Sequence, residues 1–159
     1  MSADIIHSGH IRILEAGAAY GDVIVGVLTD EAIATYKRMP MLDYETRCCI
    51  FSNIKGVSRV VRQDTLSYAA NLRALRPDYV LHGDDWKTGV QSMVRAEVIT
   101  LLQEWGGRLI EVPYTKGLDS EELSHQLPRC AAGKTAPRPE AEALHPCHRR
   151  VERADRAYR

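Results

Sequence analysis

The hydrophobic pattern of the chain alternates between helical spacing and short continuous apolar runs. Apolar residues recur at helical spacing over residues 10–20, which predicts a helix that stops at Gly21. The β-branched run over residues 22–30 is typical of a strand buried on both faces. The same criteria predict these further elements in order: a helix over 43–54, a strand over 57–61, a helix over 65–75, a strand over 78–83, a helix over 90–105, a strand over 108–114 and a helix over 119–127.

This order of elements predicts the fold class. Strands that are separated by helices pair in parallel through helical crossovers, so we expect an α/β fold with a Rossmann-like parallel sheet and flanking helices. Ligands bind beyond the carboxyl ends of the strands in such sheets. Polar segments follow three predicted strands at those ends: Thr29-Asp30, His82–Trp86 and Tyr114–Gly117. They predict one shared site, which His7–His10 joins if a strand precedes that segment.

The composition changes after residue 127. Residues 128–159 contain eight Lys and Arg against four Asp and Glu, and four of the seven prolines, but no Ile, Phe or Met. Such a segment buries too little apolar surface to offset the entropy lost on ordering. We therefore expect one globular domain over residues 1–127, followed by a disordered basic tail that is rich in Pro, Ala and Arg.

The bulk properties exclude several partners and compartments. The net charge is zero, and the chain shows neither an apolar run of membrane-spanning length nor a signal peptide. We therefore expect neither nucleic acid nor a membrane as a partner. The four cysteines have no spacing typical of a disulfide framework, which favours the cytoplasm. Cys48 and Cys49 are expected to pack on a helix face.

The segment HSGH, residues 7–10, is the first candidate site. A helix N-terminus attracts anions through its unpaired N–H groups and its dipole, and a glycine lets a phosphate approach the backbone. His7 and His10 could donate to phosphate oxygens and stabilise a displacement at phosphorus. Two surface histidines near a helix start are the alternative. Zinc is the poorer interpretation, because no third ligand lies nearby at a standard spacing.

Other polar residues each have two interpretations. Asp84 and Asp85 suit ribose hydroxyls, an ammonium group or a magnesium ion, or else they lie in a solvated turn. Trp86 stacks on a base or packs in the core. Lys37 is a functional loop residue or a solvated one. For Glu45 and Arg47, an ion pair that supports the site is slightly favoured over contact with a nucleotide.

Five segments in register resemble the cytidylyltransferases: SADIIHSGH, GVLTDE, YKRMPMLDYETR, HGDDW and YTKG. The resemblance covers residues 1–127 and none of the tail. It is strongest to the 2-aminoethylphosphonate cytidylyltransferases, in the segments MSADIIHSGHI, HGDDWK and EVPYTKG. Adenylyltransferases of the same superfamily fit less well, because HGDDW and YTKG follow the cytidylyl pattern.

The resemblance implies transfer of CMP from CTP to a phosphonate or phosphate acceptor, with release of pyrophosphate and with Mg²⁺ as cofactor. It favours 2-aminoethylphosphonate as acceptor and leaves glycerol 3-phosphate, phosphocholine and phosphoethanolamine as alternatives. His7 and His10 would stabilise the transition state, and Lys37 would bridge acceptor and α-phosphate. Asp4 would pair with an acceptor ammonium group or cap the first helix. A homodimer and fusion to a phosphoenolpyruvate mutase domain are further implied partners.

The implied site residues fall into three groups. Nucleotide contacts are implied for Ser2, Ala3, Gly9, Gly83, Asp84, Asp85, Tyr114, Thr115, Gly117 and Ser120. Acceptor contacts are implied for Asp4, Lys37 and Trp86, and a supporting role for Glu45 and Arg47.

The chain departs from the family pattern at two places. Asp119 and Glu121 stand where the family has hydroxyl residues, and their charges are expected to weaken CTP binding. The family's loop also follows a central strand, and the chain offers no such strand before residue 7. We expect a start upstream of Met1 or a longer fused protein. A non-catalytic fragment of a fused enzyme is the alternative of another class.

Overall fold

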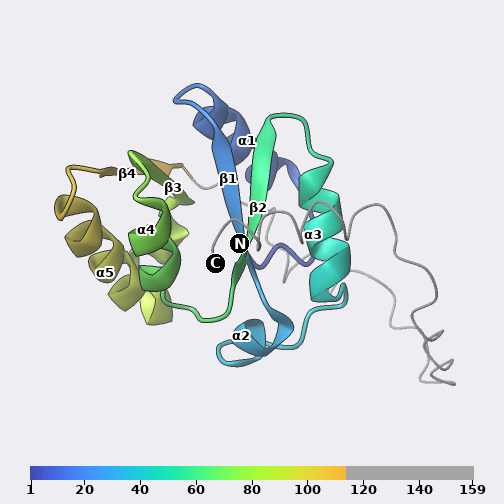
Figure 1. Ribbon diagram of the computed structural model, residues 1–159. Helices are drawn as coiled ribbons and strands as arrows, with labels where there is room; N and C mark the ends of the chain where they lie inside the picture. Colours follow the sequence, from blue (N-terminus) through green and yellow to red (C-terminus); the bar gives the residue numbers. More distant parts are fainter. Residues whose placement is uncertain (114–159) are drawn as a thin grey trace, which may run out of the picture.

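The computed structural model describes residues 1–113, apart from the side chain of Val90. The described elements are α1 (Ser8–Ala18), β1 (Val23–Leu28), α2 (Asp30–Ala34), α3 (Tyr44–Ser52), β2 (Val57–Gln63), α4 (Ala69–Leu75), β3 (Tyr79–Gly83), the 3₁₀ helices η1 (Asp84–Lys87) and η2 (Gly89–Gln91), α5 (Ser92–Gln103) and β4 (Arg108–Val112) (Figure 1). No helix of this part of the chain is long and apolar enough to cross a membrane.

The strands form two parallel pairs. β1 pairs with β2, and β3 pairs with β4, so the described residues hold two separate two-stranded sheets (Figure 1). The prediction of an α/β fold with parallel strands and flanking helices is confirmed. The helix α1 packs against β1 and also against β3 and β4, and it therefore joins the two halves.

Each pair of strands has its own core. Phe51 and Cys48 of α3 pack on Val25, Val27 and neighbouring residues of the β1–β2 pair. Burial raises the pKa of the Cys48 thiol to about 11. Cys48 is fully buried and Cys49 half-buried, which confirms the packing role for Cys48.

The second core lies between β3–β4 and the helices α4 and α5. Its buried members are Leu72, Trp86, Val98, Leu101 and Leu102.

The start of α4 and the segment after β1 differ most from the sequence prediction. The helix expected over 65–75 begins only at Ala69, because the Ser67 hydroxyl accepts from the Ala69 amide and Thr65 donates to the Ser67 carbonyl, which stabilises a turn instead. The short helix α2 was not expected. Thr29 caps it by accepting from the Ala32 amide at 3.2 Å. The predicted helix over 119–127 and the tail lie outside the described residues.

A charged cluster on Glu111 ties β4 to η1 and α5. Its carboxylate accepts two hydrogen bonds from Arg95, at 2.9 and 3.2 Å, and one from the Trp86 indole at 3.0 Å. The Nζ of Lys87 lies 3.5 Å from Oε2 of the same carboxylate. The hydrogen bonds from Arg95 are the largest cause that lowers the pKa of Glu111, from 4.5 to about 2.

This cluster gives a pH-dependent prediction. The pKa of Glu111 is lower in the folded state than in the unfolded state. The ionised carboxylate therefore stabilises the fold fully above pH 4.5, and this stabilisation is lost as the pH falls towards 2. We expect Glu111→Gln to flatten the dependence of stability on pH in this window. Urea midpoints measured between pH 5 and pH 2 test it, and parallel curves for the two proteins would contradict it.

Candidate functional site

The N-terminus of α1 is built by its two histidines. His7 is the N-cap, with extended backbone, and its Nδ1 accepts from the Gly9 amide at 3.2 Å. His10 reaches back, and its Nδ1 accepts from the His7 amide at 3.4 Å. The two rings lie with their centroids 4.0 Å apart. This is a reciprocal capping box in which imidazoles replace the usual hydroxyl and carboxylate.

The caps assign the proton on each ring. A neutral imidazole whose Nδ1 accepts a hydrogen bond carries its proton on Nε2. Both His7 and His10 are therefore donors through Nε2. Together with the positive end of the α1 dipole, they make this end of the helix favourable for an anion.

Gly9 is required by the position of the His7 ring. A Cβ at residue 9 would lie 2.9 Å from His7 Cε1 and 3.0 Å from His7 Nδ1. We expect Gly9→Ala to displace the ring and to lower the nucleotidyl transfer that the sequence resemblance implies by about ten- to a hundredfold, since a misplacement near 1 Å can have that effect. Stability should not fall, because alanine favours a helix by about 1 kcal/mol over glycine. Kinetics and thermal unfolding on one preparation test this, and unchanged kinetics would contradict it.

Lys37 approaches the same place from the loop after α2. Its Nζ donates to Ser2 Oγ at 2.8 Å and lies 5.5 Å from the centre of the Tyr36 ring. A cavity of about 900 Å³ is lined by Ser2, Lys37 and Tyr36 together with His7, Gly9, His10, Gly83 and Asp85. The structure therefore brings together the sequence-predicted histidines, the lysine and part of the polar segment after β3.

Arg47 holds the chain segment that leads to α1. Its side chain is 1% exposed and donates to the Ser2 carbonyl at 2.9 Å, to the Leu42 carbonyl at 3.1 Å and to Asp30 Oδ1 at 2.6 Å. The predicted ion pair that supports the site is present for Arg47, and its partner is Asp30. The other oxygen of Asp30 accepts from the Tyr44 amide at 3.2 Å.

Asp4 fixes the loop that carries Lys37. It is 5% exposed, and its Oδ1 accepts from the amides of Met41 and Leu42 at 2.7 and 2.9 Å. Arg38 pairs with its Oδ2 at 3.4 Å. The expectation that Asp4 caps α1 is wrong, because His7 is the cap. Asp4 is not among the residues that line the cavity, and an acceptor contact stays a prediction.

The segment after β3 divides between the cavity and the core. Gly83 and Asp85 line the cavity, whereas Asp84 does not. Instead, Asp84 Oδ2 lies 3.9 Å from Lys87 Nζ. A Cβ at residue 83 would approach Asp85 Oδ1 to 2.7 Å, so a larger residue there would displace the Asp85 carboxylate. Asp85 also lies 3.7 Å from His82 Nδ1. Ala3, Glu45 and Arg47 lie outside the cavity lining as well.

Trp86 belongs to the core and does not bind the acceptor as predicted. It is 1% exposed, donates from Nε1 to Glu111 and packs among Leu72, Val98 and neighbouring core residues. Its ring stacks on His82 with centroids 3.8 Å apart. A tryptophan buried on this scale has no face left for a ligand. Burial is the largest cause that lowers the pKa of His82.

Sequence reasoning missed several residues of the cavity wall. These are Tyr36, Tyr68, Thr88 and Gln91. His82, which the sequence placed in the polar segment after β3, also lines the cavity. The predicted residues Tyr114, Thr115, Gly117 and Ser120, and also Asp119 and Glu121, lie outside the described residues.

Comparisons with known proteins agree with this geometry. A bifunctional protein HldE from Koribacter versatilis is 30% identical over 123 residues, which are 76% of this chain and 24% of that protein. An FAD synthase from Methanopyrus kandleri is 31% identical over 86 residues, 52% of this chain and 57% of that protein. The chain thus spans about a quarter of the length of the HldE protein that it matches.

A solved structure supports the fold. The lipopolysaccharide core biosynthesis protein from Thermoplasma volcanium GSS1 superposes with a TM-score of 0.59, at 22% identity, over 72% of this chain and 91% of that one. The family description "cytidylyltransferase-like" matches residues 2–125, which include α1, the Lys37 loop and the segment after β3. The chain therefore belongs to the cytidylyltransferase-like family.

Proposed function

We propose that this protein transfers CMP from CTP to a small phosphonate or phosphate acceptor, with 2-aminoethylphosphonate as the leading acceptor, and releases pyrophosphate. The observation that carries the proposal is the meeting of His7, His10 and Lys37 around one cavity, at the N-terminus of α1 and beside the carboxyl end of β3. The choice of CTP and of the acceptor rests on the sequence resemblance.

The reaction needs positioning and charge stabilisation rather than a covalent nucleophile. An oxygen of the acceptor attacks the α-phosphorus, a new P–O bond forms, and the bond from the α-phosphorus to the bridging oxygen breaks as pyrophosphate leaves. The two imidazole Nε2–H groups would donate to oxygens whose negative charge grows in the transition state. They are oriented before the substrate binds, because each Nδ1 is fixed by the capping box.

The proposal assigns Lys37 and Asp85 to the binding of the acceptor. Lys37 carries a positive charge into the cavity and would hold the acceptor phosphonate beside the α-phosphate. Asp85 brings a half-exposed carboxylate into the same cavity, where it would attract an ammonium group. Asp4 would act indirectly, since it binds the backbone of the loop that follows Lys37.

The proposal includes Mg²⁺ that arrives with the triphosphate. In residues 1–113, no group of three His, Cys, Asp or Glu side chains is placed to hold a metal ion. This donor set fits Mg²⁺, which in such sites takes one or two carboxylates and completes its shell with phosphates and water. Because Asp85 is proposed to attract the ammonium group of the acceptor, the triphosphate and water would supply most of the ligands of the ion. When bound, the ion would neutralise phosphate charge.

ATP is the second donor to test. One similar protein is named an FAD synthase, and its product contains an adenine nucleotide. The roles proposed for the described cavity residues concern the phosphates and the acceptor and do not distinguish the bases, so experiment decides the nucleotide donor.

A panel of donors and acceptors tests the proposal. Pyrophosphate release is measured with CTP or ATP against 2-aminoethylphosphonate, glycerol 3-phosphate, phosphocholine and phosphoethanolamine, each at saturating Mg²⁺. We expect release that requires both CTP and 2-aminoethylphosphonate. Release with another acceptor would correct the acceptor. If calorimetry shows no binding of CTP or ATP to the folded protein, the non-catalytic alternative is favoured and the proposal fails.

A further inference from the structure

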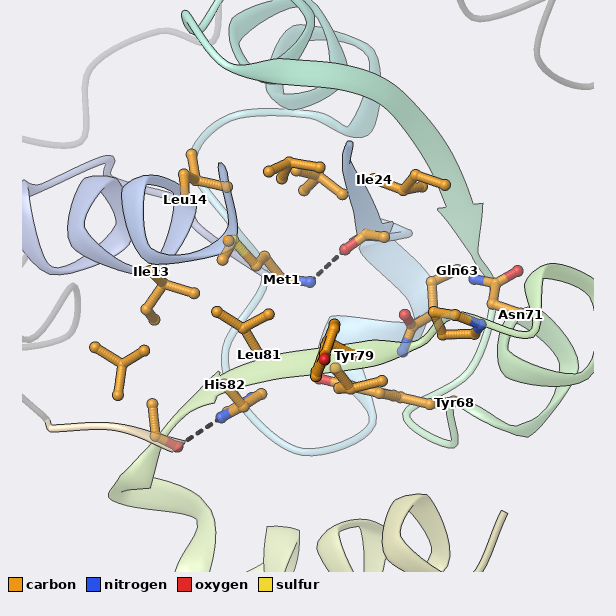
Figure 2. A pocket seen from close by; sticks show the side chains of 18 of the residues that line it. Met1, Ile13, Leu14, Ile24, Gln63, Tyr68, Asn71, Tyr79, Leu81 and His82 are labelled. Atoms are coloured by element: carbon orange, nitrogen blue, oxygen red, sulfur yellow. Dashed lines mark hydrogen bonds between the residues drawn. The ribbon is translucent and has the colours of Figure 1, made fainter. Parts of the chain in front are cut away.

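The ring of His82 is fixed at the end of β3 by contacts on its edge and on its face. Its Nδ1 lies 2.8 Å from the Gly83 carbonyl oxygen and 3.7 Å from Oδ1 of Asp85. The ring stacks on the Trp86 indole, with centroids 3.8 Å apart and 6° between the two planes. Figure 2 shows His82 in the wall of the pocket, with its hydrogen bond drawn. The ring is therefore oriented before a ligand binds.

The contact with Gly83 assigns the proton of the neutral His82 ring. A carbonyl oxygen has no proton to donate, so this hydrogen bond requires the proton on Nδ1 of the imidazole. Nε2 is then left with a lone pair. Among residues 1–113, no side chain or amide donates a hydrogen bond to this Nε2. His82 lines the cavity, so the lone pair is available to a ligand there.

His7 and His10 have the opposite arrangement. Both rings accept at Nδ1 and therefore donate through Nε2. All three imidazoles line the same cavity. Two of them offer protons, which suit phosphate oxygens, whereas His82 offers a lone pair, which suits an N–H or O–H group of a ligand.

Burial favours the neutral form of His82. It is the largest cause that lowers the pKa of this ring, and the Met1 amino group acts in the same direction. The hydrogen bond to Gly83 and the charges of Asp85 and Glu111 oppose it, and the net direction is downward. The lone pair on Nε2 is therefore present at neutral pH.

The charge beside His82 favours a cationic donor. Asp85 brings a carboxylate to the same cavity, and among the described residues no lysine or arginine forms an ion pair with it. The charge of Glu111, in contrast, is compensated by Arg95. A neutral donor would gain only a hydrogen bond at Nε2, whereas an ammonium group would also gain the attraction of Asp85.

We propose that His82 is a specificity-determining residue of the acceptor site, whose Nε2 accepts a hydrogen bond from a primary ammonium group of the acceptor. The identity of the acceptor rests on the proposed function, and the contact with His82 refines it. A trimethylammonium group carries the same charge but has no N–H to donate, so it would leave the lone pair without a partner. The acceptor nitrogen is therefore selected by its N–H groups as well as by its charge.

Matched acceptors and variants test the proposal. The acceptors are 2-aminoethylphosphonate and its N,N,N-trimethyl analogue, and the variants are His82→Phe and His82→Gln. Phenylalanine keeps a ring for the stack on Trp86 but has no lone pair, whereas the amide oxygen of glutamine supplies an acceptor. The readout is the ratio of kcat/KM for the two acceptors, measured by pyrophosphate release at saturating CTP. Thermal unfolding checks that each variant is folded.

We expect the unchanged chain to prefer 2-aminoethylphosphonate by about 10- to 100-fold, the effect of one hydrogen bond to a charged group. His82→Phe should lower this ratio to about twofold or less, through loss of activity with 2-aminoethylphosphonate, and His82→Gln should keep part of it. A preference that persists in His82→Phe would overturn the role of His82 and assign selectivity to the size of the site. The proposed function would stand in that case, because pyrophosphate is released.

A spectroscopic test does not depend on turnover. Nitrogen NMR of the imidazole rings reports which nitrogen carries the proton, and we expect Nδ1 for His82 and Nε2 for His7 and His10. The protein is then titrated with the α,β-methylene analogue of CTP and afterwards with 2-aminoethylphosphonate. We expect only the second addition to shift the His82 Nε2 resonance.

The outcomes of the titration separate the two proposals. A proton on Nε2 of His82, or no shift on addition of 2-aminoethylphosphonate, would overturn the role of His82. A shift with the CTP analogue alone would overturn it as well, because the donor would then be the amino group of cytosine. A shift with 2-aminoethylphosphonate in a protein that releases no pyrophosphate would uphold the contact with His82 and contradict the proposed function.

Discussion

Replacing His10 by alanine is expected to lower the rate of nucleotidyl transfer by about 10²–10³-fold, the effect of removing one preorganised donor from a developing oxyanion. The Nδ1 of His10 is engaged by the His7 amide, so its Nε2 carries the proton that would meet the phosphate. The effect should appear in kcat more than in KM, because the added charge that this donor stabilises arises in the transition state.

The matched control for His10 is Ser8→Ala in the same turn of α1. Ser8 is exposed and does not line the cavity, so its loss should leave kcat within about twofold. His10→Ala also removes half of the capping box, which is expected to cost about 1 kcal/mol of stability. Thermal unfolding separates this loss from the kinetic one. Equal kcat values for the two variants would contradict the role of His10.

Replacing Arg47 by alanine is expected to destabilise the protein by about 3–5 kcal/mol, as the loss of one partner from a buried ion pair does. The change leaves the carbonyls of Ser2 and Leu42 and the carboxylate of Asp30 without their donor. Lysine cannot restore three acceptors in different directions, because it lacks the planar fork of the guanidinium group. Arg47→Lys should therefore recover only part of the loss.

Arg38→Ala is the matched control for Arg47. The Arg38 side chain is 42% exposed and forms an ion pair with Asp4 at 3.4 Å. Such an exposed arginine contributes about 1 kcal/mol or less. Chemical denaturation compares the free energies of unfolding of Arg47→Ala, Arg47→Lys and Arg38→Ala. A loss for Arg47→Ala no larger than that for Arg38→Ala would contradict the central position of Arg47 in this network.

The parts of the site that sequence predicted are those that depend on local signals. The helix predicted over 10–20 follows from helical spacing within a few residues, and the structure begins it at Ser8. The parallel arrangement follows from the alternation of strands and helices. Lys37 was predicted through resemblance to a family, and the structure places it at the cavity through a contact with Ser2.

The parts that sequence could not predict depend on contacts between distant residues. Arg47 binds Asp30, 17 residues earlier in the chain, and only the position of α3 beside the first residue of α2 decides this. Asp4 binds backbone amides of the loop at 41–42, which no local pattern reports. Trp86 had two interpretations, and burial against α4 and α5 selects the core. The helix α2 is too short for a periodic pattern.

The central claim is that the cavity at the α1 N-terminus transfers a nucleotidyl group, and isotopic labelling tests it most directly. CTP that carries ³²P in its α-phosphate, or in its γ-phosphate, is incubated with the protein, Mg²⁺ and 2-aminoethylphosphonate. Attack at the α-phosphorus predicts that the α label enters the acceptor product and that the γ label leaves as pyrophosphate. Transfer of the γ label to the acceptor, or release of the α label only as free CMP, would contradict the claim.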